Sequence, residues 1–135
     1  MAGYSKRSLI NKLGIKAGQI LCLVNAPNNY NATLGDLPPA ANQVDRLNGP
    51  LDFIQYFTKS RVELEAEFPG LKQALALDGM LWISWPKKAS KIKTDLDENI
   101  IRAIGLQNGL VDVKVCAVDD VWSGLKFVYR VKDRG

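Results

Sequence analysis

The chain has 135 residues, 47% of them apolar, which is enough for one domain with a hydrophobic core and too few for two. Its net charge of +4 is a mild basic excess that does not by itself indicate a nucleic-acid partner. Histidine is absent, which excludes Ser-His and Cys-His nucleophile pairs and imidazole ligation of zinc.

The N-terminal third predicts one buried strand between irregular segments. A short amphipathic helix is expected over Ser5–Leu13 and should end at Gly14. Ile20–Ala26 is a nearly continuous apolar run, typical of a parallel strand that is covered on both faces. Within the irregular region that follows, we expect one helical turn at Tyr30–Leu34 and a short edge strand at Gln43–Leu47.

A second strand is predicted at Leu51–Phe57, only three residues after the edge strand. A parallel crossover needs a dozen or more residues, so these two strands should pair antiparallel or not at all. Ser60 and Glu63 then form a capping box that opens a helix. Its core-facing stripe is Leu64, Phe68, Leu71 and Leu75, and we expect Pro69 to kink or restart the helix.

The C-terminal half predicts a third strand, a helix and a strand pair. Asp78 and Gly79 should end the preceding helix and lead into the strand Met80–Trp85. After a basic loop, Thr94 or Asp95 should cap a helix with Leu96, Ile100, Ala103 and Ile104 on one face and Gly109 at its end. Val111–Val118 and Leu125–Val131 are joined by so short a turn that they must pair antiparallel.

These elements predict an α/β fold: a single three-layer Rossmann-like domain over residues 1–135, with a mostly parallel sheet and a C-terminal antiparallel strand pair. Cys22 and Cys116 lie in apolar strand-like runs and are expected to be small buried hydrophobes rather than a disulfide. No run reaches the roughly 18 apolar residues of a membrane span, and the N-terminus lacks a signal-peptide core, so we expect a cytoplasmic protein without membrane contact.

The order of strands and helices resembles that of class I S-adenosylmethionine (SAM)-dependent methyltransferases. The amino-acid sequences of several segments are also similar to those of a bacterial family of small proteins of unknown function, over about residues 13–130. The segments that carry this second resemblance are LVNAPNNY, SRVEL, LWISWPKKASK, TDL and GLVDVKVCAVDDVWSGLKFVYR.

The methyltransferase resemblance implies a reduced scaffold, because one helix and one strand of that pattern are missing. The glycine-rich loop after the first strand is replaced by Asn25–Asn29, and Asp45 is the candidate for the acidic residue that binds the ribose hydroxyls. Because the turn carries side chains and a proline where close approach is needed, we expect no cofactor and no SAM binding of physiological affinity.

Ligands of open parallel sheets bind beyond the carboxyl ends of the strands, and polar, cationic and aromatic residues follow each predicted strand here. Backbone amides at the helix that starts at Ser60, with four nearby cations, would form an anion site, and Trp85 or Trp122 could stack on a flat ligand. The opposing interpretation is a solvated lysine loop, packed tryptophans and a tight turn at the aspartates. The candidate ligand-binding residues are Asn25, Asn28, Tyr30, Lys59, Ser60, Arg61, Trp85, Lys87, Lys88, Asp119 and Trp122.

The sequence therefore favours a cytoplasmic, non-enzymatic binding domain that recognises a phosphate-bearing small molecule or a protein partner. No catalytic or metal-binding residue is assigned, although Asp119 and Asp120 could act as a base or a magnesium ligand. The alternatives are a minimal SAM-dependent methyltransferase with an atypical cofactor loop and a weak single-stranded nucleic-acid binder. Strong nucleic-acid binding is not expected, since acidic residues adjoin the short basic run.

Overall fold

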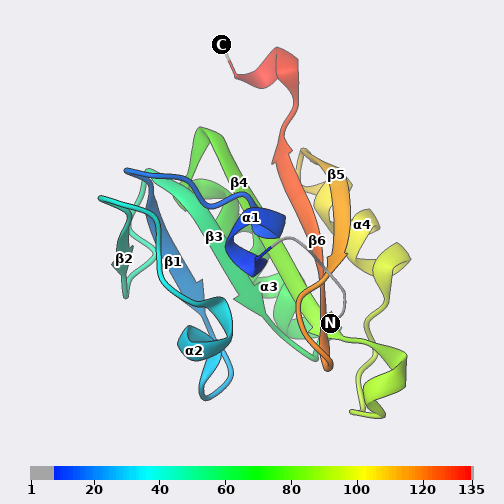
Figure 1. Ribbon diagram of the computed structural model, residues 1–135. Coiled ribbons are helices and arrows are strands. Elements are labelled where there is room, and N and C mark those ends of the chain that lie inside the picture. The colour runs from blue at the N-terminus through cyan, green and yellow to red at the C-terminus, as the bar shows by residue number, and fades with distance from the viewer. Residues whose placement is uncertain (1–7, 135) are drawn as a thin grey trace.

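A computed structural model describes residues 8–134 and shows a six-stranded sheet between two layers of helices (Figure 1). The strand order across the sheet is β2-β1-β3-β4-β6-β5. The strands are β1 (Ile20–Val24), β2 (Asn42–Val44), β3 (Leu51–Phe57), β4 (Leu75–Pro86), β5 (Leu110–Ala117) and β6 (Trp122–Tyr129).

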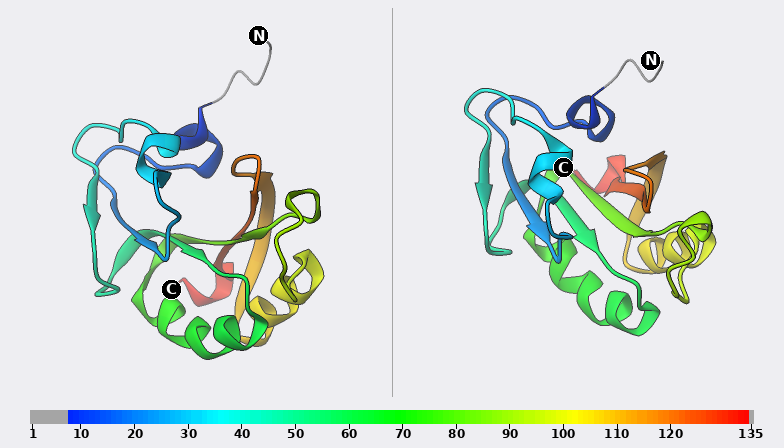
Figure 2. Two further views of the ribbon diagram at one scale, coloured as in Figure 1. Left: turned by 90° about the horizontal axis from the view of Figure 1, so that it is seen from below. Right: turned by 60° about the horizontal axis from the view of Figure 1, so that its bottom comes forward.

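The helices cover both faces of the sheet, with α1 and α2 on one side and α3 and α4 on the other (Figure 2). This arrangement confirms the predicted α/β fold with three layers. The helices are α1 (Leu9–Leu13), α2 (Tyr30–Leu34), α3 (Arg61–Ala74) and α4 (Glu98–Gln107), with 3-10 turns η1 (Lys88–Ser90) and η2 (Val131–Asp133).

The sheet is mostly parallel, as predicted. β1 pairs in parallel with β2 on one side and β3 on the other, and β3 pairs in parallel with β4. β6 is antiparallel to both β4 and β5, so β5 points the same way as the first four strands. β2 and β3 do not pair with each other, and the chain order reverses between β1 and β3, where open sheets of this kind bind ligands.

Two apolar cores hold the layers together, one on each face of the sheet. Leu64, Phe68 and Leu71 of α3 are fully buried in the first core, as the predicted stripe requires. Trp85 lies in this same core, whereas Trp82 lies in the second core beneath α1 and α2. The three-residue separation of the tryptophans places them on opposite faces of β4, as expected for a strand.

The predicted end of α3 and start of β4 are wrong. The helix continues through Pro69 but ends at Ala74, and β4 begins at Leu75, which pairs with Leu51 of β3. The spacing from Leu71 to Leu75 suits a helix, but pairing with β3 determines the conformation here. A register irregularity follows before Met80 pairs with Phe53, so residues 76–79 form an irregular start to the strand.

The predicted cap of α4 is also displaced. Asp97 is the N-cap, and its carboxylate accepts a hydrogen bond of 2.8 Å from the amide of Ile100. Thr94 and Asp95, the residues predicted to cap α4, instead contact the segment that starts α3. Ile101 and Ile104 are buried, while Ala103 is exposed.

Other predicted bounds agree with the structure within a few residues. α2 and β3 have the predicted bounds, and Gly14 ends α1 in the left-handed conformation. The start predicted for α1, at residues 5–7, lies outside the described residues. Cys22 is buried and Cys116 half-buried, and neither is in a disulfide. No helix within residues 8–134 has the length and hydropathy that a membrane span would need.

Candidate functional site

The turn after β1 follows a glycine-like path although it contains no glycine. Asn25 and Asn29 have φ angles of 59° and 68°, in the left-handed region that glycine favours. Asparagine tolerates this region better than most residues, because its short polar side chain bonds locally. The Asn25 amide nitrogen lies 3.4 Å from the carbonyl oxygen of Phe57, so its side chain crosses from β1 toward the end of β3. Asn28 is exposed in the middle of the turn.

An open hollow lies beside this turn, between β1, β2 and α2. Its volume of about 720 Å³ is within the range of small-molecule pockets. The parallel register that sets Leu21 opposite Gln43 brings the carboxyl ends of β1 and β2 together at this hollow. The carboxylate of Asp45 is close enough to Cys22 to add to the effect of burial in raising the pKa of that thiol. The residues that line the hollow are Leu23, Asn31, Gln43, Val44 and Asp45.

Behind the turn, Tyr30 is a buried anchor rather than a ligand contact. Its hydroxyl donates a 2.7 Å hydrogen bond to Gln55, whose amide donates at 3.1 Å to the hydroxyl of Ser84. All three side chains are buried, and burial raises the pKa of Tyr30 well above its usual range. The Tyr30 and Trp122 rings meet the Phe57 ring edge-on at 4.8 and 5.2 Å. This network therefore fixes α2 and the turn on the sheet.

The start of α3 is already satisfied by the protein's own groups. Ser60 caps the helix by accepting from the amide of Glu63, at 3.1 Å, which is half of the predicted capping box. The carboxylate of Asp95 accepts from the amide of Arg61 at 2.8 Å, and the hydroxyl of Thr94 donates to the carbonyl of Lys59 at 2.7 Å. The carboxylate of Asp95 thus takes the helix-terminal position that the sequence analysis assigned to a bound anion.

Replacing Asp95 with alanine should therefore lower the free energy of unfolding by about 1 kcal/mol, because the Arg61 amide loses its charged acceptor. Urea denaturation of the purified protein measures the change. Asp120→Ala is the matched control, since Asp120 is an exposed aspartate, and its effect should stay within about 0.5 kcal/mol. Equal effects of the two substitutions would contradict the role given to Asp95.

The remaining predicted site residues are divided between two adjoining hollows. Trp85 and Lys88 line one of about 420 Å³, and Lys59 and Ser60 line the other, of about 340 Å³. The Arg61 side chain turns along α3 to pair with Glu65 at 3.2 Å. Lys87 follows β4, where its amide donates to the carbonyl of Val121, and Lys88 is exposed in η1. Trp85 is only 6% exposed and packs in the core between the sheet and the helices α3 and α4, so it offers little ring surface for stacking.

Asp119 has a local structural role. Its carboxylate accepts hydrogen bonds of 2.8 Å from the amides of both Val121 and Trp122, which closes the turn between β5 and β6. Trp122 is half-buried against Phe57. Among residues 8–134, no group of three histidine, cysteine, aspartate or glutamate side chains is arranged to hold a metal.

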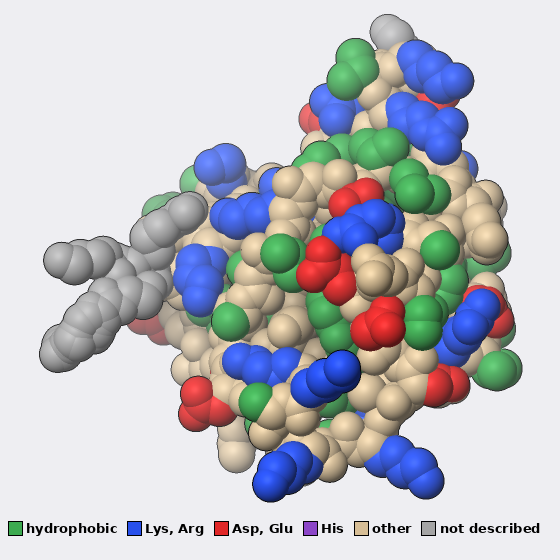
Figure 3. Space-filling view, turned by 90° about the vertical axis from the view of Figure 1, so that its right-hand side faces the viewer, with side chains coloured by type: hydrophobic (Ala, Val, Ile, Leu, Met, Phe, Trp, Pro, Cys, Tyr) green, Lys and Arg blue, Asp and Glu red, His purple; other side chains and the backbone are tan. Residues whose placement is uncertain are grey.

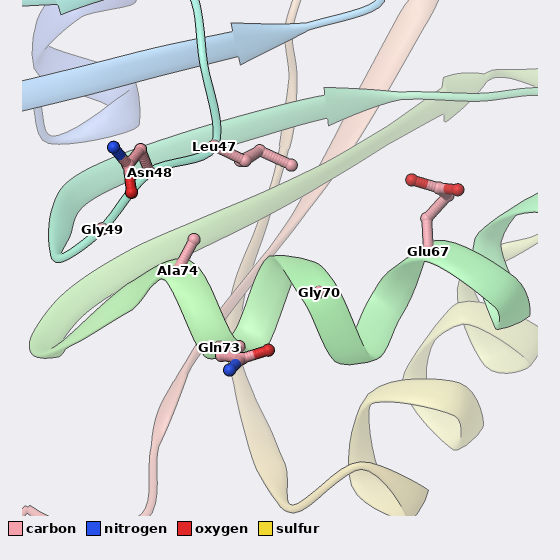
Figure 4. A pocket seen from close by; sticks show the side chains of 7 residues that line it. All are labelled: Leu47, Asn48, Gly49, Glu67, Gly70, Gln73 and Ala74. Carbon is pink, nitrogen blue, oxygen red and sulfur yellow. The ribbon is translucent and has the colours of Figure 1, made fainter.

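A second hollow, of about 460 Å³, lies away from the carboxyl edge (Figure 4). It separates the loop before β3 from α3, and the side chains of Leu47 and Ala74 point into the gap. Gly49 is required here because a Cβ atom would lie 2.3 Å from the carbonyl oxygen of Ala74. The hollow lies near the amino end of β3 and so is not at the ligand-binding end of the sheet.

Several solved structures with a similar fold are SAM-dependent methyltransferases. The chain is similar to magnesium protoporphyrin IX methyltransferase from Synechocystis PCC 6803 with bound SAM, at 15% identity and a TM-score of 0.60, over 90% of this chain and 74% of that one. It is also similar to precorrin-6y C5,15-methyltransferase from Geobacter metallireducens, at 8% identity and a TM-score of 0.62, over 90% and 86% of the two chains. A TehB-like SAM-dependent methyltransferase from Corynebacterium glutamicum matches at 12% identity and a TM-score of 0.56, over 90% and 85%.

These comparisons correct two expectations from the sequence. The interpretation as a non-enzymatic binding domain is contradicted, because many of the similar solved structures are methyltransferases, which favours the methyltransferase alternative. No protein-family model and no curated protein matches the sequence, so the resemblance to a bacterial family of unknown function has no support. The methyltransferase-like fold itself is confirmed.

Sequence reasoning missed most of the hollow beside β2. It identified Asp45 but not Asn31 or Gln43, which line the same hollow. A signal was present in the expected edge strand Gln43–Leu47, where the polar residues Gln43 and Asp45 flank Val44. Polar residues at the carboxyl end of a short parallel strand mark a ligand-facing end when the neighbouring strand is known.

Proposed function

We propose that this chain is a minimal SAM-dependent methyltransferase whose cofactor binds in the hollow between β1, β2 and α2. The observation that carries the proposal is the combination of the methyltransferase-like sheet with a hollow at the carboxyl ends of β1 and β2 that Asp45 borders. In open sheets of this type, a carboxylate that follows the second strand binds ribose hydroxyls, and Asp45 follows β2 directly.

The residues around the hollow between β1, β2 and α2 are compatible with a bound SAM molecule. The left-handed Asn25 and Asn29 let the turn take a path that usually requires glycine, so the absence of glycine does not itself close the site. The contact between Asn25 and the Phe57 carbonyl directs that side chain toward β3 and away from β2. Leu23 and Val44 offer apolar surface, while Asn31, Gln43 and Asp45 offer polar groups that can fix orientation.

When bound, SAM supplies an electrophilic methyl group, and the protein's contribution to such a reaction is mainly binding and orientation. Asp45 would accept hydrogen bonds from the ribose hydroxyls, and Asn31 and Gln43 would position the rest of the molecule. Tyr30, held by Gln55, keeps α2 and the turn in place. No described residue is assigned as a catalytic acid or base, because Asp119 is committed to its own turn.

Replacing Asp45 with asparagine should weaken binding of the product analogue S-adenosylhomocysteine about tenfold or more, since a carboxylate that accepts two hydroxyl hydrogen bonds becomes an amide. The measurement is ligand-induced thermal stabilisation. At 100 times its dissociation constant, a ligand stabilises the native state by about 2.7 kcal/mol, which is readily detected.

The matched control is Asp36→Asn, an exposed aspartate outside the hollow. It should be stabilised by the ligand as much as the unmodified protein is. Equal ligand stabilisation of the Asp45 and Asp36 variants would overturn the placement of the site. A complete lack of stabilisation in the unmodified protein would overturn the proposed function itself.

A further inference from the structure

Four lysines gather on the α1 side of the sheet from three separate segments of the chain. We call Lys12, Lys16, Lys114 and Lys126 the lysine patch. Lys114 of β5 lies directly opposite Lys126 of β6 in the antiparallel register, which places both side chains on the same face. The Lys114 ammonium donates a 3.2 Å hydrogen bond to the carbonyl oxygen of Lys12 at the end of α1. This bond joins the helix to the strand pair.

Two arginines form the ion pairs described within residues 8–134. Arg61 pairs with Glu65, and Arg102 pairs with both Glu98 and Asp112. Within residues 8–134, none of the four patch lysines forms an ion pair with an acidic side chain. Like charges directly opposite each other on neighbouring strands are destabilising, so the Lys114–Lys126 pair lowers the stability of the fold.

Burial and repulsion both act on Lys126. Burial lowers its pKa, and the charges of Lys114 and Lys16 lower it further. A lowered lysine pKa means that the charged form is disfavoured in the native state. The loss of folding stability from a charged Lys126 is therefore fully present at neutral pH. It is relieved only as pH rises through the lowered pKa toward the ordinary value of 10.5. A bound anion would remove the same cost at neutral pH.

The patch is open and continues toward the carboxyl edge of the sheet. Lys16 and Lys114 are exposed, while Lys12 and Lys126 are half-buried. Ala117, at the end of β5, is three residues from Lys114, or about 10 Å along a strand. Figure 3 faces the β5 side and shows lysine and arginine side chains along its left and lower margins. An extended polyanion fits such a surface better than a compact ligand does.

We infer that the lysine patch binds the phosphate backbone of single-stranded RNA, which would make RNA the substrate class of the proposed methyltransferase. The identification of RNA as a substrate rests on the proposed function. Binding of RNA to the lysine patch does not, because it does not require SAM. Lysines act as point charges that neutralise phosphates and release counterions, so the interaction is independent of base sequence and sensitive to salt. Its expected strength at physiological salt is that of non-specific binding, with dissociation constants of roughly 10⁻⁴ to 10⁻⁶ M.

The test is fluorescence anisotropy with a labelled single-stranded RNA of mixed sequence, using the full chain without SAM at several salt concentrations. Lys114→Gln and Lys126→Gln should each weaken binding about three- to tenfold at low salt. Each should also reduce the slope of log affinity against log salt by about 0.7, the value for one phosphate contact on a single strand. Lys132→Gln, an exposed lysine of η2, should bind as the unmodified protein does.

The melting temperature of the variants is a second measurement. Substitution of a lysine with a purely structural role would lower it. The melting temperature of the Lys126 variant should equal or exceed that of the unmodified protein, because one of two opposed charges is removed. The Lys114 variant also loses its hydrogen bond to the Lys12 carbonyl, so Lys126 gives the cleaner measurement. Absence of RNA binding at low salt, or equal binding by the patch variants and the Lys132 variant, would overturn the inference. So would binding to vesicles of phosphatidylserine and phosphatidylcholine but not to RNA. Because SAM is absent throughout, none of these outcomes bears on the cofactor site.

Discussion

Replacing Trp82 with alanine is expected to lower the free energy of unfolding by about 3–5 kcal/mol. Trp82 is fully buried in the core beneath α1 and α2, and its indole N–H donates a 2.9 Å hydrogen bond to the carbonyl oxygen of Leu13 at the end of α1. The substitution therefore leaves a large cavity and also releases the contact that fastens α1 to the sheet. Urea denaturation gives the loss, and hydrogen exchange of the α1 amides reports the release.

Two further variants separate the causes. Trp82→Phe keeps most of the apolar volume but removes the indole N–H, so it should cost less than the alanine variant while still speeding exchange in α1. Leu106→Ala alters an exposed leucine of α4 and should change stability by less than about 1 kcal/mol. A loss below about 1 kcal/mol for Trp82→Ala would show that the core beneath α1 is not packed as described.

The second large effect is expected at a helical glycine. Gly105 lies in α4, where an added Cβ atom would be 2.0 Å from a ring carbon of Phe127 in β6. Because that ring is fully buried and meets Phe68 edge-on, it has little freedom to move. Gly105→Ala should therefore destabilise the protein by about 1–3 kcal/mol, despite the better helix propensity of alanine.

Gly70 is the matched control, because it is also inside a helix but has no atom within 4 Å of the position of an added Cβ. Gly70→Ala should stabilise the protein by about 0.5–1 kcal/mol through helix propensity alone. Thermal unfolding of both variants measures the difference in sign. If both substitutions stabilise the protein, α4 does not pack against β6 as closely as the structure describes.

Local patterns in the sequence predict much of this fold. The bounds of α2 and β3 follow from apolar runs and turn residues, and the burial of Leu64, Phe68 and Leu71 follows from helical spacing. The start of β4 at Leu75 could not be predicted in this way. It depends on pairing with Leu51, 24 residues earlier, and the residue spacing alone favours a longer helix.

The candidate site was less predictable, because its groups come from distant segments. Asp95 reaches the amide of Arg61 from 34 residues away, so the helix terminus that looked free in the sequence is occupied. In the turn after β1, asparagines adopt the left-handed conformation, and asparagine predicts that conformation less clearly than glycine does. The lysine patch likewise depends on the register between β5 and β6, which brings Lys114 and Lys126 face to face.

Calorimetric titration of the unmodified protein with SAM tests the central claim most directly. We predict saturable binding of one molecule with a dissociation constant in the low micromolar range or tighter, roughly 7 to 8 kcal/mol of binding free energy. The expected contacts are the polar groups around the hollow between β1, β2 and α2, including Asp45. The absence of saturable heat with SAM at concentrations up to about 1 mM, which corresponds to about 4 kcal/mol, would contradict the claim.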